Sequence, residues 1–262
     1  MKVTILGTGT SQGIPVIGCK CPTCLSTNPK DKRLRVSAYI EVPGYGMNGN
    51  DTLKILIDTS SDFRQQMLTN NFDDVDAVLF THHHIDHIGG MDDLRQINQQ
   101  KKKRIDIYGN QLTIDEIKTT FRYVLDQRLI DHNAVPLINF NYIDNSPFKI
   151  NGLEIIPIEV YHGNLPILGF RIQNFAYITD ASRIEESEFS KLQNLDVLVL
   201  NALRKRPHPT HFNLEQSIEA AKNTKAKQTY FTHITHDMMH DEVNAELPPE
   251  IQLGYDGLFF EI

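Results

Sequence analysis

The chain has 262 residues, of which 40% are hydrophobic and 23% charged, a composition typical of a globular protein, and no apolar run is long enough to cross a membrane. The formal net charge of -7 disfavours broad electrostatic binding to nucleic acid, although a local basic patch would still be compatible with it. The N-terminus enters a strand-like pattern without an apolar signal segment, so we expect a cytoplasmic protein.

Apolar runs rich in Val and Ile predict two successive groups of strands. The first group covers residues 3–9, 36–42, 53–59, 77–82 and 104–109. The second covers residues 152–161, 168–173, 175–180, 195–202 and 228–233. Helical patterns cover residues 62–70, 91–100, 185–194 and 213–223. Because such runs are typical of strands covered by helices, we expect one α/β domain over residues 1–262, built from two similar halves.

A helical excursion is predicted between the two halves, at about residues 110–136, and we place it near the expected active site. Such a segment could cover the site or could be a plain crossover connection.

Four ligand-type side chains follow the predicted strand 77–82: His82, His84, Asp86 and His87. Alternate side chains of an extended segment point the same way, so one metal can take His82 and His84, while His83 should point away. Asp86 and His87 lie past the turn and can face a second metal. This order, at the carboxyl end of a strand, indicates a metal site in a crevice of an α/β fold.

A two-metal site needs further ligands, and three other strand-like runs end on suitable residues. These residues are His162, Asp180 and His233. An aspartate can bridge two cations and offset their charge. The repeated placement of these side chains directly after strands predicts that they join the same site.

Three cysteines lie close together in the stretch GCKCPTC: Cys19, Cys21 and Cys24. Their spacing is too short for an ordinary disulfide framework and indicates metal thiolates in a reducing compartment. A closed tetrahedral zinc needs a fourth ligand, for which His236 in the stretch THITH is the natural candidate. The alternative is a free, partly buried cysteine cluster.

The H-x-H-x-D-H motif, with the later His162, Asp180 and His233, resembles the metallo-β-lactamase superfamily over nearly the whole chain. The resemblance implies a four-layer αββα sandwich with a binuclear site at the edge of two facing sheets. It also implies the ligand assignment. The first metal would be held by His82, His84 and His162, the second by Asp86, His87 and His233, and both would be bridged by Asp180.

The stretches GTGTSQGIPVIGCKCPTC and THITH look like the PhnP branch of this superfamily, which comprises phosphoribosyl cyclic phosphate phosphodiesterases with a structural zinc. PqqB proteins look similar at the cysteines but lack the full catalytic histidine set. The PhnP resemblance implies that His211 is a non-ligand active-site histidine, which protonates the leaving alkoxide or holds the phosphate. A surface histidine at a helix entry is the alternative. We assign no role to His83, His132, His208 or His240.

Two segments look longer than in that branch, the excursion 110–136 and the loop PGYGMNGNDT at 43–52. Either could alter the substrate pocket or a subunit contact. A homodimer is an expectation from the resemblance alone.

The expected function is hydrolysis of a small, cyclic or linear phosphodiester by a metal-activated hydroxide that Asp86 positions. Histidine and carboxylate ligands suit Zn²⁺, Mn²⁺ and Fe, so the sequence leaves the two active-site metals open beside one structural Zn²⁺. Alternatives are an RNase Z-like nuclease, a hydrolase of carbonyl substrates such as thioesters or lactones, and a metal-binding module without catalysis. The acidic chain argues against the nuclease, and the complete ligand set argues against the inactive module.

Overall fold

The computed structural model describes residues 1–46 and 51–262, and its centre is a pair of facing β-sheets. The first sheet has seven strands in the order β15 (Phe259–Glu261), β1 (Lys2–Gly7), β2 (Ser37–Pro43), β3 (Thr52–Ile57), β4 (Ala77–Leu79), β5 (Ile105–Gly109) and β6 (Ile138–Tyr142). The second has eight strands, in the order β11 (Arg183–Ile184), β8 (Leu153–His162), β9 (Leu165–Ile172), β10 (Phe175–Ile178), β12 (Val197–Asn201), β13 (Gln228–Thr232) and β14 (Ile251–Leu253), with β7 (Phe148–Ile150) paired to β8.

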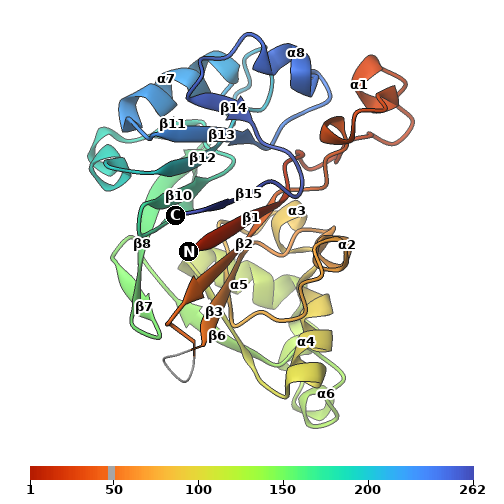
Figure 1. Ribbon diagram of the computed structural model, residues 1–262. Helices are drawn as coiled ribbons and strands as arrows, with labels where there is room; N and C mark the ends of the chain where they lie inside the picture. The colour runs from red at the N-terminus through yellow and green to blue at the C-terminus, as the bar shows by residue number, and fades with distance from the viewer. Residues whose placement is uncertain (47–50) are drawn as a thin grey trace.

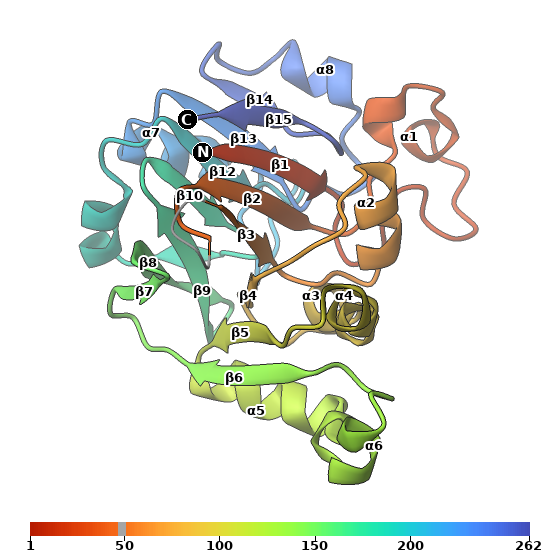
Figure 2. The same ribbon diagram turned by 60° about the horizontal axis from the view of Figure 1, so that its bottom comes forward.

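Helices cover the outer face of each sheet (Figure 1). The first sheet carries α2 (Phe63–Thr69), α4 (Leu94–Lys101), α5 (Gln111–Thr120) and α6 (Gln127–Asp131), and α6 lies beyond the edge strand β6 in Figure 2. The second sheet carries α7 (Leu214–Thr224), α8 (His240–Asn244) and the 3-10 helix η4 (Glu186–Leu192). Shorter helical turns are α1 (Pro22–Leu25), η1 (Pro29–Asp31), α3 (Ile85–Ile88), η2 (Met91–Asp93) and η3 (Arg122–Leu125).

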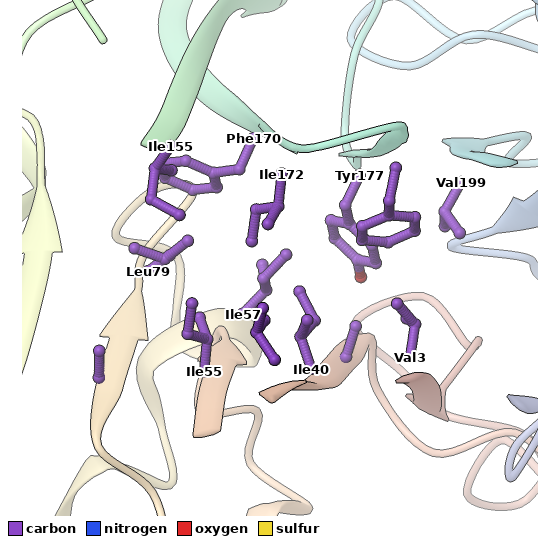
Figure 3. Close-up of a cluster of buried hydrophobic side chains, with 14 of the residues drawn as sticks. Val3, Ile40, Ile55, Ile57, Leu79, Ile155, Phe170, Ile172, Tyr177 and Val199 are labelled. Carbon is purple, nitrogen blue, oxygen red and sulfur yellow. The ribbon is translucent and has the colours of Figure 1, made fainter. Parts of the chain in front are cut away.

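Three layers of buried apolar side chains account for this four-layer arrangement. The middle layer joins both sheets: Ile57 and Leu79 of the first sheet face Ile172 and Ile155 of the second (Figure 3). A second layer lies between the first sheet and its helices, and a third between the second sheet and its helices. Strands buried on both faces read as continuous apolar runs, which explains the sequence pattern. The predicted αββα sandwich is therefore confirmed.

Parallel pairing brings several strand ends to one edge. Strands β3, β4, β5 and β6 pair in parallel, and so do β10, β12, β13 and β14. The backbone N–H of Leu168 in the second sheet donates to the carbonyl of Thr81, just past β4, at 3.0 Å. The two sheets are thus joined directly beside the residues that follow β4.

Several predicted boundaries differ from the structure. The predicted strand 77–82 ends at Leu79, because the N–H of Thr81 leaves the ladder to donate to Asp58 Oδ1 at 2.8 Å. The predicted helix 185–194 forms as a 3-10 helix. The short strands β6, β7, β11, β14 and β15, of 2 to 5 residues each, were not predicted from the sequence.

The excursion 110–136 forms α5, η3 and α6 and connects the parallel strands β5 and β6, so it serves as their crossover. That this segment lies near the active site stays a prediction. The assignment of residues 1–262 to one domain also stays a prediction. Residues 47–50 of the loop 43–52 lie outside the described residues. Within the part of the chain that the structure describes, no helix is both long and apolar enough to span a membrane.

The middle layer should dominate stability. We expect Phe170→Ala, at a fully buried ring, to lower the free energy of unfolding by about 3–5 kcal/mol, because it removes apolar contacts and leaves a cavity. The control Phe259→Ala, at a ring that is 61% exposed, should cost less than about 1 kcal/mol. Urea denaturation measures both, and equal losses would contradict this account of the core.

Candidate functional site

Polar residues converge where buried strands of both sheets end. Asp58 follows β3, Asp180 lies two residues past β10, and His233 follows β13. All three have left-handed backbones, with φ of 59°, 58° and 55°, and all three are buried. This conformation is uncommon for residues other than glycine and tends to occur at functional sites, where the surrounding fold enforces it. The strand ends therefore mark one prearranged centre.

Two glycines let the histidine cluster approach this centre closely. A Cβ on Gly89 would lie 2.6 Å from Ser61 Oγ and from the Ile85 carbonyl oxygen, and one on Gly90 would lie 2.4 Å from the Ser60 carbonyl oxygen. The N–H of Gly90 also donates to the Thr59 carbonyl. The pair of glycines thus fixes the end of α3, the short helix that carries Asp86 and His87, against the segment that follows β3.

Asp58 and Thr81 orient two imidazoles. The Thr81 hydroxyl donates to Asp58 Oδ2 at 2.8 Å, so its oxygen accepts from His82 Nδ1–H at 3.0 Å. Asp58 Oδ2 also accepts from His87 Nδ1–H at 2.8 Å. A neutral imidazole has one N–H and one lone pair, so both rings present Nε2 lone pairs to the centre.

His162 and His84 complete this side of the centre. His162 Nδ1 donates to the carbonyls of Asp180 and Thr210, at 3.0 and 2.8 Å, so its Nε2 also carries a lone pair. His84 Nδ1 lies 3.0 Å from His82 Nε2. The alternation predicted for His82 and His84 therefore brings two nitrogens to one point.

Asp180 lies among the imidazoles. Its carboxylate oxygens are 3.4 Å from His87 Nε2, 3.3 Å from His233 Nε2 and 3.1 Å from His211 Nε2. Asp86 Oδ2 is 3.4 Å from His87 Nε2 and 3.8 Å from His233 Nε2. The two carboxylates are thus shared by histidines from both sheets.

Burial and charge shift the pKa values at this centre in opposite directions. Burial opposes ionisation of Asp180, but the neighbouring His233 and His87 hold its pKa well below the usual range. Burial also opposes a charge on His87, yet Asp180, Asp86 and Asp58 raise its pKa well above the usual value. Burial lowers the pKa of His82 far below its usual value. The centre therefore favours anionic carboxylates that need positive charge beside them.

Metal ions satisfy this arrangement better than protons do. His87 Nε2 and both ring nitrogens of His233 are buried without a hydrogen-bond partner among the described residues, which is costly unless they bind another group. Overlapping sets of donor atoms lie within 4.8 Å of one another: His82, His87 and Asp180; Asp86, His87 and His233; His162, Asp180 and His211. Imidazole and carboxylate donors at these separations fit divalent metals.

Six of the seven residues predicted for the active-site metals belong to these donor sets. The seventh, His84, lies beside them, with its Nδ1 3.0 Å from His82 Nε2. His211 joins them through Asp180, whereas His83 belongs to none of the donor sets described above. His132 is exposed and bonds Arg128, and His240 is buried beside Asn244. Sequence reasoning missed Asp58. The signal was present, because Asp58 ends the apolar run LKILID just as Asp180 ends FAYITD.

The cysteines form a second donor cluster. His236 Nδ1 lies 3.3 Å from Cys19 Sγ and 3.5 Å from the sulfurs of Cys21 and Cys24. The N–H of Cys24 donates to Cys21 Sγ and lowers the pKa of that thiol. The four residues predicted to hold a structural zinc thus lie together, and donors of these types suit one tetrahedral ion.

A buried ion pair ties this cluster to the rest of the fold. The Arg33 guanidinium donates to the carbonyls of Thr235 and Met238, at 2.9 and 2.8 Å, on either side of His236. Asp31 lies 3.5 Å from Arg33 and accepts from the His240 N–H at 2.8 Å. Burial lowers the pKa of Arg33 to about 10, which leaves it charged at neutral pH.

A cavity of about 550 Å³ opens beside His211. Its lining is mostly polar and includes Asn164, Ser182, Arg183, His208 and Gln216. Arg183 lies over the ring of Tyr161 and pairs with Glu185 at 2.8 Å. The cavity offers hydrogen-bond donors and a cation to a bound molecule.

Comparison with known proteins agrees with this geometry. A protein of Porphyromonas gingivalis named octanoyltransferase is 38% identical over 261 residues, which are 98% of this chain and 51% of that protein, so the chain spans about half of its length. The solved structure of a new diphosphatase from the PhnP family is 39% identical, with a TM-score of 0.89, and the match covers 100% of this chain and 97% of that one.

Zinc-bound PqqB from Methylobacterium extorquens shares the fold, with a TM-score of 0.75 at 19% identity and a match that covers 100% of both chains. The model of the beta-lactamase superfamily domain matches residues 54–234. With a matched family model and a PhnP-family relative over its whole length, the chain belongs to the beta-lactamase superfamily and to the PhnP family within it.

Proposed function

We propose that the chain is a hydrolase with two divalent metals that cleaves a small phosphodiester. His82, His84 and His162 would hold the first metal, Asp86, His87 and His233 the second, and Asp180 would bridge them. The observation that carries this proposal is the outward hydrogen bonding of His82, His87 and His162, which turns three Nε2 lone pairs towards one buried centre. The fold of the superfamily implies divalent metals, and Zn²⁺, Mn²⁺ and Fe all suit these ligands.

When bound, two such metals supply Lewis acidity and a water-derived nucleophile at neutral pH. The chain's own residues would then direct the reaction. Asp86 would orient the attacking oxygen by a hydrogen bond. His211, whose Nε2 lies 3.1 Å from Asp180 Oδ2, would as an imidazolium give its Nε2 proton to the leaving alkoxide and end as the neutral ring.

The cavity beside His211 supports a phosphoryl substrate. Its lining of amides, hydroxyls and Arg183 matches phosphate and sugar oxygens, whereas an octanoyl chain would need an apolar groove. The relative named octanoyltransferase is about twice as long as this chain, so its name does not locate that activity in the matched half. The diphosphatase relative, 39% identical, favours a phosphoanhydride as the second candidate substrate.

Cys19, Cys21, Cys24 and His236 would hold a third metal, a structural zinc. These four side chains would fill all four coordination positions of a tetrahedral zinc and leave none for a substrate, as in structural zinc sites. This site would supply no chemistry. It would fix the loop that also carries His233.

A substrate panel with metal analysis on the same sample tests the proposal. We expect turnover of bis-p-nitrophenyl phosphate and of a small cyclic phosphodiester, with three metals per chain. A diphosphate, a tRNA precursor and a thioester complete the panel. Turnover of the thioester without any phosphoryl substrate would overturn the proposal, and turnover of the diphosphate alone would favour the second candidate.

Variants distinguish the proposed acid role of His211 from the metal-binding role of the ligands. His211→Ala should mainly lower kcat while metal content stays near wild type, because its proposed role is proton delivery. His84→Ala and Asp180→Ala should lose metal together with activity. Steady-state kinetics with metal analysis measures both effects, and an unchanged kcat in His211→Ala would exclude the acid role.

Asp58→Asn tests the orientation of the ligands. Asp58 accepts on both oxygens, from the Thr81 N–H on Oδ1 and from the Thr81 hydroxyl and the His87 N–H on Oδ2. An amide has one accepting oxygen and would turn its NH₂ group towards one of these donors, so affinity for the second metal should fall by about 10- to 100-fold. The control Asp74→Asn removes a carboxylate that pairs with Lys54 in β3 and with Lys103, which precedes β5. Metal titration should show wild-type metal affinity for this control. Equal losses in both variants would point to a general charge effect.

A further inference from the structure

The basic run KKKR at residues 101–104 has no part in the metal centre. It leads from the end of α4 into β5, close to the loop that connects α6 to β6. These segments surround a cavity of about 490 Å³, which we call the basic pocket. Its polar lining includes Arg95, Gln99, Lys102, Arg104 and Asn133.

Hydrogen bonds hold the two sides of the basic pocket together. The side chain of Asn98, which is buried in α4, donates to the carbonyls of Lys103 and Leu137 at 2.9 and 3.0 Å and accepts from the Leu137 N–H at 2.9 Å. From the same helix, the Arg95 guanidinium donates to the Ala134 carbonyl at 2.9 Å. The walls of the pocket are therefore fixed by contacts within the fold.

Three of the cations that line the basic pocket have no acidic partner. Lys103 is neutralised by two aspartates. In the part of the chain that the structure describes, Arg95, Lys102 and Arg104 form no ion pair with a carboxylate, and Arg95 Nε is buried without a hydrogen-bond partner. The carboxyl end of α4 contributes a partial charge of only about -0.5, which three cations outweigh. The pocket therefore keeps a net positive charge.

The basic pocket and the metal centre lie at opposite edges of the first sheet. Strands β4, β5 and β6 run parallel, and Arg104 and Leu137 directly precede β5 and β6. Asp58 and Thr81 lie past the ends of β3 and β4, at the edge where the parallel strands finish. A molecule in the basic pocket would therefore be separate from the substrate, and its binding does not depend on the proposed function.

We propose that the basic pocket binds a phosphate group, either as inorganic phosphate or on a small phosphate ester. Three cations without acidic partners match a dianion, and guanidinium groups bind phosphate oxygens through paired hydrogen bonds. The cavity volume lies in the range of small-molecule sites. Val135 and Leu137 also line it and supply an apolar wall for the carbon skeleton of an ester.

Titration of the zinc-loaded protein with inorganic phosphate and with AMP, followed by ¹H–¹⁵N NMR, tests this site. We expect saturable shifts of the backbone amides of Lys102, Arg104 and Asn133. Because these amides lie in the basic pocket, their shifts distinguish binding there from binding at the metals. Tighter binding of AMP would identify the occupant as a phosphate ester, and equal binding would identify it as inorganic phosphate.

Lys102→Gln and Lys101→Gln form a matched pair of variants. Each removes one positive charge from the same run, but Lys101 pairs with Asp73 and does not line the basic pocket. Loss of one charge-assisted hydrogen bond should weaken binding to Lys102→Gln by about tenfold, whereas Lys101→Gln should bind like the wild type. Absence of saturable shifts at the pocket amides, or equal weakening in both variants, would overturn the proposal. Neither result depends on whether the chain hydrolyses a phosphodiester.

Discussion

The direction in which each imidazole offers its lone pair is the constraint on which this centre depends. A neutral ring has one lone pair, and a ring that turned it outward would present an N–H to the centre, where that nitrogen could not bind a metal. Asp58, Thr81 and two backbone carbonyls each accept an N–H on the outer side of a ring. These bonds are formed by groups inside the fold, so the centre is organised before any metal binds.

The facing sheets make this arrangement possible. Asp58 follows β3 of the first sheet and Asp180 follows β10 of the second. Both contact the ring of His87, so the ends of these strands lie at the same edge of the sandwich. Both residues adopt left-handed backbones that turn the chain sharply as the strand ends. The apolar layer between the sheets supplies the stability that maintains such backbone strain. Packing and site geometry are therefore two consequences of the same pair of sheets.

Sequence patterns reveal the ligands better than the groups that support them. The H-x-H-x-D-H order and the placement of His162, Asp180 and His233 after strands indicate a site, because few other roles need such side chains there. Asp58 carries the same signal but not the neighbouring histidines that would draw attention to it.

The loop from His233 to His236 links the two donor clusters. His233 faces Asp180 and Asp86, while His236, three residues later, faces the three cysteines. Arg33 donates to the carbonyl of Thr235, which lies between these two histidines, and to the carbonyl of Met238, which lies two residues past His236. A buried arginine is stable only while its partners are in place, so this loop has little freedom to move alone. Displacement of the cysteine cluster would therefore act on His233 directly, and a metal without chemistry of its own would still stabilise the catalytic geometry.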